Sequence, residues 1–266
     1  MSENKFTVLT GACGGLGQAF SKELVSAGNN LIITGTSQAK IDAFIAELKK
    51  INPKVCVLGF VMNLSSEDSI ASFVEELTKL NVEVNRLINN AGLIVEGGFL
   101  DLSESQVLNA IKINCLGTVS LTRKMLKAFE IKEILTTSSL GGFYPMPQMS
   151  TYAATKSFLE KFMASLHEEL KPQKIKVSVL CPGGIPTTAA MKDAIISQGV
   201  GGKLTAKSPE YIAKYALKKL KNNKTVIIPG FANRFVRFIS RFCGEAFLAH
   251  RVNKMWQKAN KKRTVK

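Results

Sequence analysis

Short apolar segments alternate with longer segments of helical periodicity along most of the 266-residue chain, and this alternation limits the fold more than any other feature. The strand-like segments span residues 6–9, 31–34, 55–61, 86–88, 133–137, 176–180 and 225–228. The helical segments span 16–27, 39–50, 66–80, 103–129, 152–170 and 209–220. Since the strand-like segments do not alternate polar and apolar residues, both faces of each strand should be buried. The pattern predicts an α/β fold with a doubly wound, seven-stranded parallel sheet and helices on both faces, in one domain of residues 1–230.

Composition excludes several classes of site. The five cysteines are odd in number, lie far apart and form no CxxC pair, and no signal-peptide pattern begins the chain, so we expect reduced thiols and a cytoplasmic protein. The longest uncharged segment, 134–155, contains two prolines and two glycines and is no spanning helix. Two histidines without a cysteine cluster predict no metal site, and we expect His167 and His250 to be packing or surface residues.

Basic residues are concentrated at the C-terminal end. The formal net charge is +16, and the last 53 residues hold fifteen Lys or Arg against one acid, Glu245. Residues 231–266 therefore read as a basic helical extension of the domain, with two helices separated at Gly244. Apolar residues recur there at helical spacing: Phe231, Phe235, Phe238, Phe242, Ala246, Ala249, Val252 and Trp256. This stripe either packs over the substrate pocket or against another subunit, or anchors the protein on an anionic membrane. Nucleic acid is the weakest alternative, because no fold that binds it accompanies the charge.

A glycine-rich turn follows the first strand and leads directly into a helix. Its residues are Gly11, Ala12, Cys13, Gly14, Gly15, Leu16 and Gly17. Glycines here allow a pyrophosphate to approach the backbone, and the helix N-terminus offers N–H groups to it. A tight turn without a ligand is the alternative. The spacing TGxxxGxG resembles the nucleotide-binding turn of the short-chain dehydrogenase/reductase family.

A second segment, Asn89-Asn90-Ala91-Gly92, follows the fourth strand and matches the NNAG segment of that family. The resemblance implies that the asparagine side chains support the central strand. It also implies that the backbone of Asn90, Ala91 and Gly92 lines the adenosine site.

A third set has the spacing S-x12-Y-x3-K: Ser139, Tyr152 and Lys156, with Asn114 upstream. The Tyr-x-x-x-Lys step places both side chains on one helical face, and a lysine ammonium near the phenol should lower its pKa. The resemblance implies that Tyr152 is the general acid/base, while Lys156 tunes it and holds the nicotinamide ribose. It further implies that Ser139 orients the substrate carbonyl. Asn114 then anchors a water in the proton relay and interrupts its helix.

The loop after the sixth strand completes the resemblance, which covers residues 5–230 and implies a Rossmann-like domain. Pro182, Gly183, Ile185 and Thr187 match a family motif that holds the nicotinamide carboxamide. In the loop after Ser139, Phe143, Tyr144 and Met146 either line the substrate pocket or only pack the loop. Tyr144 is not the catalytic tyrosine, because Gln148 rather than lysine stands four residues on.

The end of the second strand bears on the choice of dinucleotide. Gly35 stands where NAD-specific relatives carry an aspartate. The Thr36 and Ser37 hydroxyls, with Lys40, are candidates to receive a 2′-phosphate, although the arginine common at position 36 in NADP-dependent relatives is missing. NADP(H) is therefore favoured, with NAD(H) as the alternative. Asn63 and Leu64 follow the third strand, where relatives contact adenine.

Together these features predict an oxidoreductase that uses NAD(P)(H) to reduce a carbonyl, or to oxidise the secondary alcohol, of a lipophilic substrate. A PG-x-x-NR feature, comprising Pro229, Gly230, Asn233 and Arg234, resembles family members close to acyl-chain and steroid ketone reductases. The alternative is a dinucleotide-binding regulatory or scaffold protein, membrane-peripheral through its basic C-terminus. By resemblance we also expect a homodimer or homotetramer formed through the helices that carry Asn114 and Tyr152.

Overall fold

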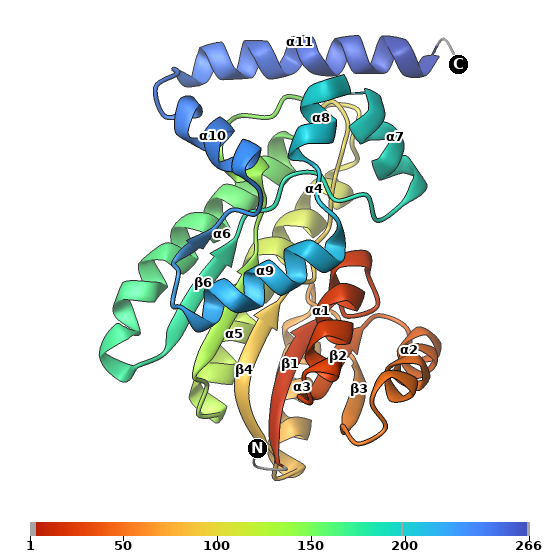
Figure 1. Cartoon of the computed structure of the whole chain (residues 1–266), viewed down its shortest axis with the longest axis vertical. Coiled ribbons are helices and arrows are strands. Elements are labelled where there is room, and N and C mark those ends of the chain that lie inside the picture. The colour runs from red at the N-terminus through yellow and green to blue at the C-terminus, as the bar shows by residue number, and fades with distance from the viewer. Residues whose placement is uncertain (1–3, 198, 265–266) are drawn as a thin grey trace.

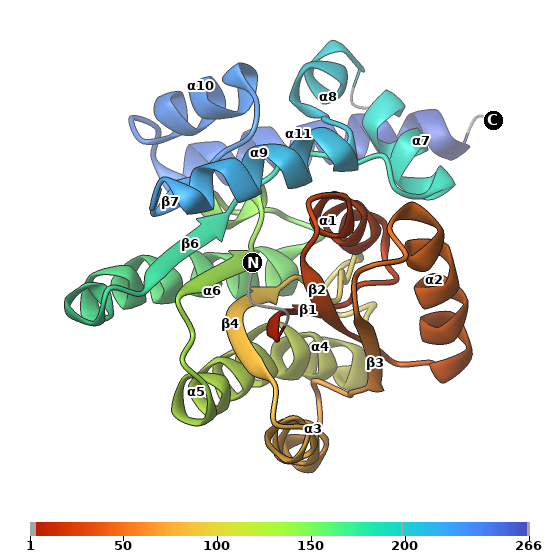
Figure 2. The ribbon, with the colours of Figure 1, turned by 60° about the horizontal axis from the view of Figure 1, so that its bottom comes forward.

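The computed structural model describes residues 4–197 and 199–264, and its strands form one parallel sheet in the order β3-β2-β1-β4-β5-β6-β7 (Figures 1 and 2). The strands are β1 Lys5–Thr10, β2 Asn30–Gly35, β3 Val57–Val61, β4 Glu83–Asn89, β5 Glu133–Thr137, β6 Lys176–Leu180 and β7 Val226–Ile227. All six neighbouring pairs are parallel. The predicted doubly wound, seven-stranded α/β fold is confirmed, with strand ends shifted by a few residues.

The strand order reverses between β1 and β4, where the chain crosses from one half of the sheet to the other. Thr10, the last residue of β1, pairs with Thr34 of β2 on one side, while Leu9 pairs with Ile88 of β4 on the other. In open parallel sheets, ligands bind in the crevice at such a reversal, beyond the carboxyl ends of the strands. By this rule we expect the crevice to lie beside the glycine-rich turn.

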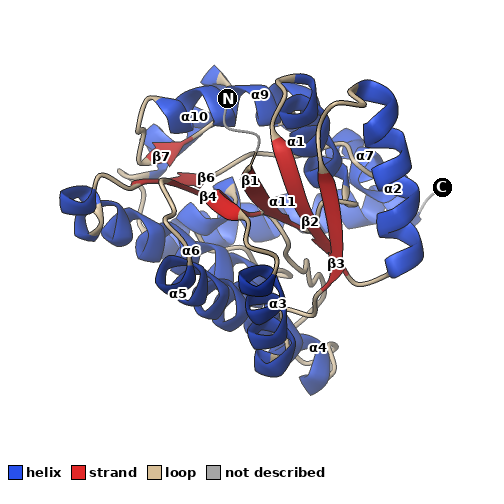
Figure 3. Cartoon of the chain, turned by 90° about the horizontal axis from the view of Figure 1, so that it is seen from below, coloured by secondary structure: helices blue, strands red, loops and turns tan. Residues whose placement is uncertain are grey.

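Helices cover both faces of the sheet (Figure 3). One face carries α1 Gly15–Ser26, α2 Gln38–Ile51 and α9 Pro209–Lys221; the other carries α3 Glu67–Lys79, α5 Thr118–Ala128 and α6 Ser150–Glu169. A separate cluster of buried apolar side chains fills each layer between helices and sheet. The central strands are apolar on both faces because both layers bury them; Leu31, Ile32 and Ile33 of β2 are all fully buried.

The predicted helical segment at 103–129 is not one continuous α-helix, and the interruption expected at Asn114 is confirmed. It comprises α4 Glu104–Ile111, a π-helical segment η1 Lys112–Gly117 and α5. Gly117 lies against the Leu64 carbonyl so closely that a side chain there would collide with it. Asn114, inside η1, bonds the backbone of Leu93 rather than facing solvent. These contacts account for the local rewinding, and π-helical turns are frequent at functional sites.

The remaining helices lie at the carboxyl ends of the strands, with α11 crossing that end of the molecule (Figure 1). They are α7 Ala189–Ser197, α8 Gly199–Thr205, α10 Phe231–Ser240 and α11 Glu245–Thr264. Gly244 separates α10 from α11, as the sequence predicts. Within the described chain, no helix is both long and apolar enough to cross a membrane.

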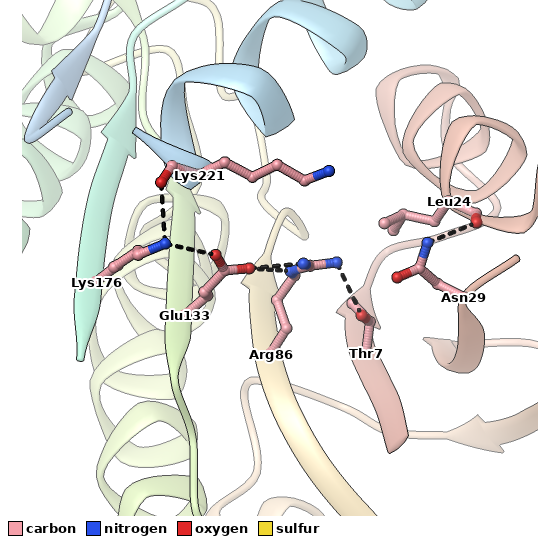
Figure 4. Close-up of polar contacts among 7 residues, drawn as sticks. All are labelled: Thr7, Leu24, Asn29, Arg86, Glu133, Lys176 and Lys221. Atoms are coloured by element: carbon pink, nitrogen blue, oxygen red, sulfur yellow. Dashed lines mark hydrogen bonds and ion pairs between the residues drawn. The ribbon is translucent and has the colours of Figure 1, made fainter. Parts of the chain in front are cut away.

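An ion-pair ladder joins the strands in the amino-terminal half of the sheet (Figure 4). The Arg86 guanidinium on β4 contacts Glu133 of β5 at 2.6 and 2.7 Å. Glu133 also meets the Lys176 ammonium of β6 at 3.5 Å, and Arg86 donates to the Thr7 hydroxyl of β1 at 3.4 Å. Lys176 further donates to the Lys221 carbonyl at the end of α9. The ladder thus crosses four strands on the side of the sheet remote from the crevice.

Candidate active site

The glycine-rich turn forms a close-packed cradle between β1 and α1. Gly11 adopts a φ of +64° and lies so near Ala91 that a side chain at position 11 would come within 2.8 Å of the Ala91 Cα atom. A side chain at Gly15 would collide with Thr187 of the loop after β6. Gly14 is the N-cap of α1 and gives no side-chain acceptor, and the first turn of α1 holds no acid. The N-terminus of α1 is therefore open to an anion.

The two asparagines after β4 fasten neighbouring strands together. Asn89 is buried and donates to the hydroxyls of Thr122 and Thr136, at 2.9 and 3.2 Å. The Asn90 amide donates to the Thr10 carbonyl at 3.2 Å and to the Gly11 carbonyl at 3.3 Å. These contacts fit the strand-supporting role that the resemblance implies, and they hold the glycine turn beside the residues that follow β4.

Tyr152 and Lys156, one turn apart on α6, meet Ser139 beyond the end of β5. The Lys156 ammonium donates to the Thr137 carbonyl at 2.9 Å and lies 5.8 Å from the centroid of the Tyr152 ring. The Ser139 hydroxyl accepts from the Gly141 N–H at 3.1 Å and also hydrogen-bonds Tyr152. The fold thus brings the three predicted side chains into one cluster at the crevice.

Burial controls the ionisation of this cluster. It raises the pKa of Tyr152 above its usual value of 10.0, and the hydrogen bond from Ser139 only partly opposes this. The expectation that Lys156 lowers the phenol pKa is therefore wrong for the protein alone. The reason is that desolvation of the phenol is the largest influence on its pKa. Burial also lowers the pKa of the Lys156 ammonium from 10.5 to about 8. Tyr152 consequently keeps its proton at neutral pH.

Asn114 is fully buried beside this cluster, and protein groups engage both ends of its amide. Its oxygen accepts from the Leu93 N–H at 2.7 Å. Its nitrogen donates to the Leu93 carbonyl at 2.9 Å and to the Thr155 hydroxyl at 3.0 Å. The Asn114 amide therefore fixes the chain after Gly92 against α6, next to Lys156.

The loop after β6 is tied to the cluster of Ser139, Tyr152 and Lys156 on one side and to the C-terminal helices on the other. The Pro182 carbonyl accepts from the Leu140 N–H at 2.8 Å. Gly183 lies against Asn233, whose buried amide donates to the Thr205 carbonyl of α8 at 3.0 Å and the Pro229 carbonyl at 2.7 Å. Ile185 packs partly buried against the core. The PG-x-x-NR motif singled out Asn233, but the sequence did not predict that Asn233 contacts this loop.

At the far end of the crevice, Thr36 is exposed and Ser37 is the N-cap of α2, where its side chain makes no capping hydrogen bond. The Cys13 thiol lies 3.7 Å from the Lys40 carbonyl, so the glycine turn and the start of α2 are adjacent. Asn63 is exposed, and its side-chain oxygen accepts from the backbone and hydroxyl of Ser65, at 3.0 and 2.8 Å. That oxygen is thus already engaged within the chain.

The loop after Ser139 packs inward. Phe143 contacts the core cluster of β4, β5 and α6, and the Arg237 guanidinium of α10 lies 4.0 Å from its ring centroid. Burial raises the pKa of Tyr144 to about 12. Met146 lies against Gly141. For Phe143 these contacts favour loop packing over a pocket wall, and Arg237 is a contact that the sequence did not reveal.

Comparison with known proteins identifies the family. The model of the short chain dehydrogenase family matches residues 5–196. A 3-oxoacyl-(acyl-carrier-protein) reductase from Aquifex aeolicus is 33% identical over 226 residues, which cover 81% of this chain and 89% of the relative. The chain belongs to the short-chain dehydrogenase family.

Further relatives and a solved structure are also similar to this chain. A very-long-chain 3-oxoacyl-CoA reductase from Phaeosphaeria nodorum is 29% identical over 258 residues, covering 90% of this chain and 72% of the relative. The chain spans 63% of a reductase of the same name from Podospora anserina. Among solved structures, a 7beta-hydroxysteroid dehydrogenase superposes with a TM-score of 0.82 at 17% identity, over 94% of this chain and 96% of that one. This last likeness concerns the fold.

Proposed function

We propose that this protein is an NADP(H)-preferring reductase of a lipophilic 3-oxoacyl thioester. The observation that carries the proposal is the cluster of Ser139, Tyr152 and Lys156 at the crevice, beside the glycine cradle. The substrate class draws on the Aquifex and Phaeosphaeria relatives, both named as 3-oxoacyl reductases. Membrane-peripheral attachment through the basic C-terminus belongs to the same proposal.

The residues present fit a nicotinamide dinucleotide. The cradle at Gly11 and Gly15 has no room for side chains, and the open N-terminus of α1 suits a pyrophosphate. Residues proposed to hold the dinucleotide are those of the turn and the neighbouring loops: Gly11, Cys13, Gly14, Gly15, Leu16, Gly17, Thr36, Ser37, Asn63, Leu64, Asn90, Ala91, Gly92, Tyr152, Lys156, Pro182, Gly183, Ile185 and Thr187. When bound, this cofactor supplies a hydride to the carbonyl carbon of a substrate.

The side chains of the cluster supply the proton. Because burial keeps the Tyr152 phenol protonated, it can donate to the carbonyl oxygen as that oxygen gains charge, giving a secondary alcohol. The Ser139 hydroxyl oxygen accepts from Gly141, and its O–H, which hydrogen-bonds Tyr152 in the protein alone, can donate to the same carbonyl oxygen when a substrate is bound. Lys156, with a pKa of about 8, exchanges protons near neutral pH and can return the proton to Tyr152. We assign Asn114 the positioning of this relay.

The central test uses Tyr152→Phe, with Tyr211→Phe as a matched control because Tyr211 is an exposed residue of α9. The substrates are 3-oxoacyl-CoA thioesters of increasing chain length, and the readout is NADPH oxidation. We expect Tyr152→Phe to abolish turnover, while the melting-temperature shift caused by NADPH persists. Turnover that survives in Tyr152→Phe would refute its role as the acid.

Cofactor preference has its own test. We expect NADPH to raise the melting temperature more than NADH at equal concentration. Gly35→Asp should reverse that order, because a carboxylate at the end of β2 repels a 2′-phosphate and accepts hydrogen bonds from ribose hydroxyls. The Ile41 side chain would lie 3.3 Å from the new Cβ atom, so the substitution needs only a small adjustment. An unchanged order in Gly35→Asp would place phosphate recognition elsewhere.

A dinucleotide-binding regulatory or scaffold protein is the alternative, since a scaffold could keep the cradle and the basic extension without the chemistry. Such a protein has no use for the buried Lys156 and its bond to Thr137. Tight NADPH binding without turnover of any 3-oxoacyl or steroid ketone would favour this alternative.

We also propose self-association through the helices that carry Asn114 and Tyr152. Large apolar side chains are exposed on these helices: Leu108, Ile111, Leu116 and Phe158. Light scattering of Leu116→Ser/Phe158→Ser against the parent protein tests this assembly, and an unchanged mass would contradict it.

A further inference from the structure

Helix α10 faces the protein with its polar side. Asn233 and Ser240, seven residues apart on one face, are its buried residues, and Arg237 between them lies over the Phe143 ring. Asn233 bonds the carbonyls of Thr205 and Pro229. The usual amphipathic arrangement, with apolar residues inward, is therefore reversed in this helix.

The apolar side of α10 points outward. Phe231 and Phe242 are about three-quarters exposed, at 76% and 75%, while Phe235 and Phe238 are 54% and 55% exposed. The patch continues onto α11 at Phe247, which is 58% exposed. The alternative in which the stripe packs over the substrate pocket does not hold for these residues, because their polar neighbours occupy the inner face. Contiguous exposed aromatic residues of this kind indicate an interaction surface, which a partner molecule or a membrane covers.

The charge around this aromatic patch indicates what kind of surface covers it. Arg234 and Arg241 on α10, and Arg251 and Lys254 on α11, are exposed beside the phenylalanines. Over residues 231–266 the sequence holds ten Lys or Arg against one acid. Two copies of the chain meeting through this face would bring these like charges together, which disfavours a homodimer there. An anionic surface that also accepts aromatic rings satisfies both features.

We propose that the outward face of α10, comprising Phe231, Phe235, Phe238 and Phe242 with Arg234 and Arg241, docks the protein on an anionic phospholipid bilayer. The rings enter the boundary between headgroups and acyl chains, and the guanidinium groups contact lipid phosphates. A helix lying in the interface needs no spanning segment, in keeping with the finding that no described helix is long and apolar enough to cross.

The docking helix contacts the catalytic end of the molecule. Arg237 joins α10 to Phe143, four residues beyond Ser139, and Asn233 joins it to α8 and to Gly183. Figure 1 shows α10 and α8 together at the carboxyl ends of the strands. If the proposed function holds, the crevice lies on the side of the protein that meets the bilayer, where a long acyl chain resides. The docking itself does not depend on turnover.

Vesicle sedimentation of the full-length protein tests the aromatic part. Probes are vesicles of phosphatidylcholine alone and of phosphatidylcholine with phosphatidylglycerol. We expect pelleting with the mixed vesicles, and a partition coefficient at least about tenfold lower for Phe235→Ser/Phe238→Ser, since binding scales with buried apolar area. The matched control is Ile51→Ser/Leu80→Ser, which removes two exposed apolar residues at the ends of α2 and α3. Equal pelleting of both double variants would overturn the proposal.

The charged part needs a second pair of variants. Arg241→Gln/Arg251→Gln should lower partitioning by about fivefold for each arginine, whereas Lys49→Gln/Lys50→Gln on α2 should have little effect. Added salt should weaken binding of the parent protein. Equal binding to neutral vesicles, or no binding to either kind, would overturn the proposal. So would light scattering that shows Phe235→Ser/Phe238→Ser dissociating a dimer, because the face would then join two copies of the chain. NADPH oxidation with soluble substrate, measured in parallel, separates these outcomes from failure of the catalytic assignment.

Discussion

The buried ammonium of Lys156 should make stability depend on pH in a way that one substitution can isolate. Its side chain is 4% exposed and donates to the Thr137 carbonyl, and burial lowers its pKa from 10.5 to about 8. Below pH 8 the folded protein holds a desolvated charge. Between about pH 8 and 10.5 the folded state has lost that proton while the unfolded state still binds it. The contribution of Lys156 to the free energy of unfolding therefore rises with pH between about pH 8 and 10.5.

The magnitude follows from the shift. Each pH unit inside the window is worth about 1.4 kcal/mol, so the rise from pH 8 to about 9.5 amounts to roughly 2 kcal/mol. Raised pKa values at Cys181 and Tyr144 act in the opposite direction at alkaline pH, because the folded state retains protons there that the unfolded state releases. The comparison must therefore be a difference between two variants rather than one pH profile.

Lys156→Met keeps the aliphatic stem and removes the titrating group. We expect the unfolding free energy of Lys156→Met minus that of the parent, from urea denaturation, to fall by about 2 kcal/mol between pH 7 and 9.5. Loss of the bond to Thr137 shifts this difference by an amount that does not vary with pH. Lys49→Met, at an exposed position on α2, should show no such trend. A difference that stays level over this range would refute the desolvation argument.

Two further outcomes test contacts elsewhere in the fold. Arg86→Met should lower the free energy of unfolding, measured by urea denaturation, by about 3 kcal/mol, because the Glu133 carboxylate, 14% exposed, loses its closest partner. Adding Glu133→Leu should recover most of that loss, because no buried charge is then left unpaired. No recovery would contradict this reasoning. Asn233→Ala should raise the KM for NADPH more than it lowers kcat, because the Asn233 amide that contacts both Gly183 and the Thr205 carbonyl is removed. An unchanged KM would show that Asn233 serves folding alone.

The sheet and the grouping of the candidate site residues were largely predictable because each rests on local sequence. Unbroken apolar strands separated by helical periods permit little other than a parallel sheet covered on both faces. The sheet reversal then brings the glycine turn, the residues after β4 and the end of β5 together, whatever the details of packing. The helical segments predicted at 66–80 and 209–220 also begin close to where the structure has them, with the Ser66 and Ser208 hydroxyls accepting N–H bonds as N-caps.

Ionisation was less predictable, because it depends on what surrounds a group in three dimensions. The spacing of Tyr152 and Lys156 shows that the ammonium is near the phenol, but not that both groups are desolvated. Desolvation acts on each group separately and here outweighs their mutual effect on Tyr152. The interruption of 103–129 at Asn114 was expected only from the family resemblance, since the contacts that hold it join Asn114 to residues far away in the chain.

The orientation of α10 could not be predicted from the periodicity of its apolar residues. A stripe of phenylalanines at steps of three and four establishes that a helix has an apolar face, yet says nothing about where that face points. What orients α10 is the opposite face, where Asn233 has carbonyl partners on α8 and at Pro229, and Arg237 has an aromatic partner after Ser139. Turning the helix to bury its phenylalanines would leave those carbonyls without a donor and would place Arg237 in solvent. The polar contacts therefore keep the aromatic face outward. Exposing its apolar surface to water is unfavourable, and this free-energy cost is removed only when another surface covers the face.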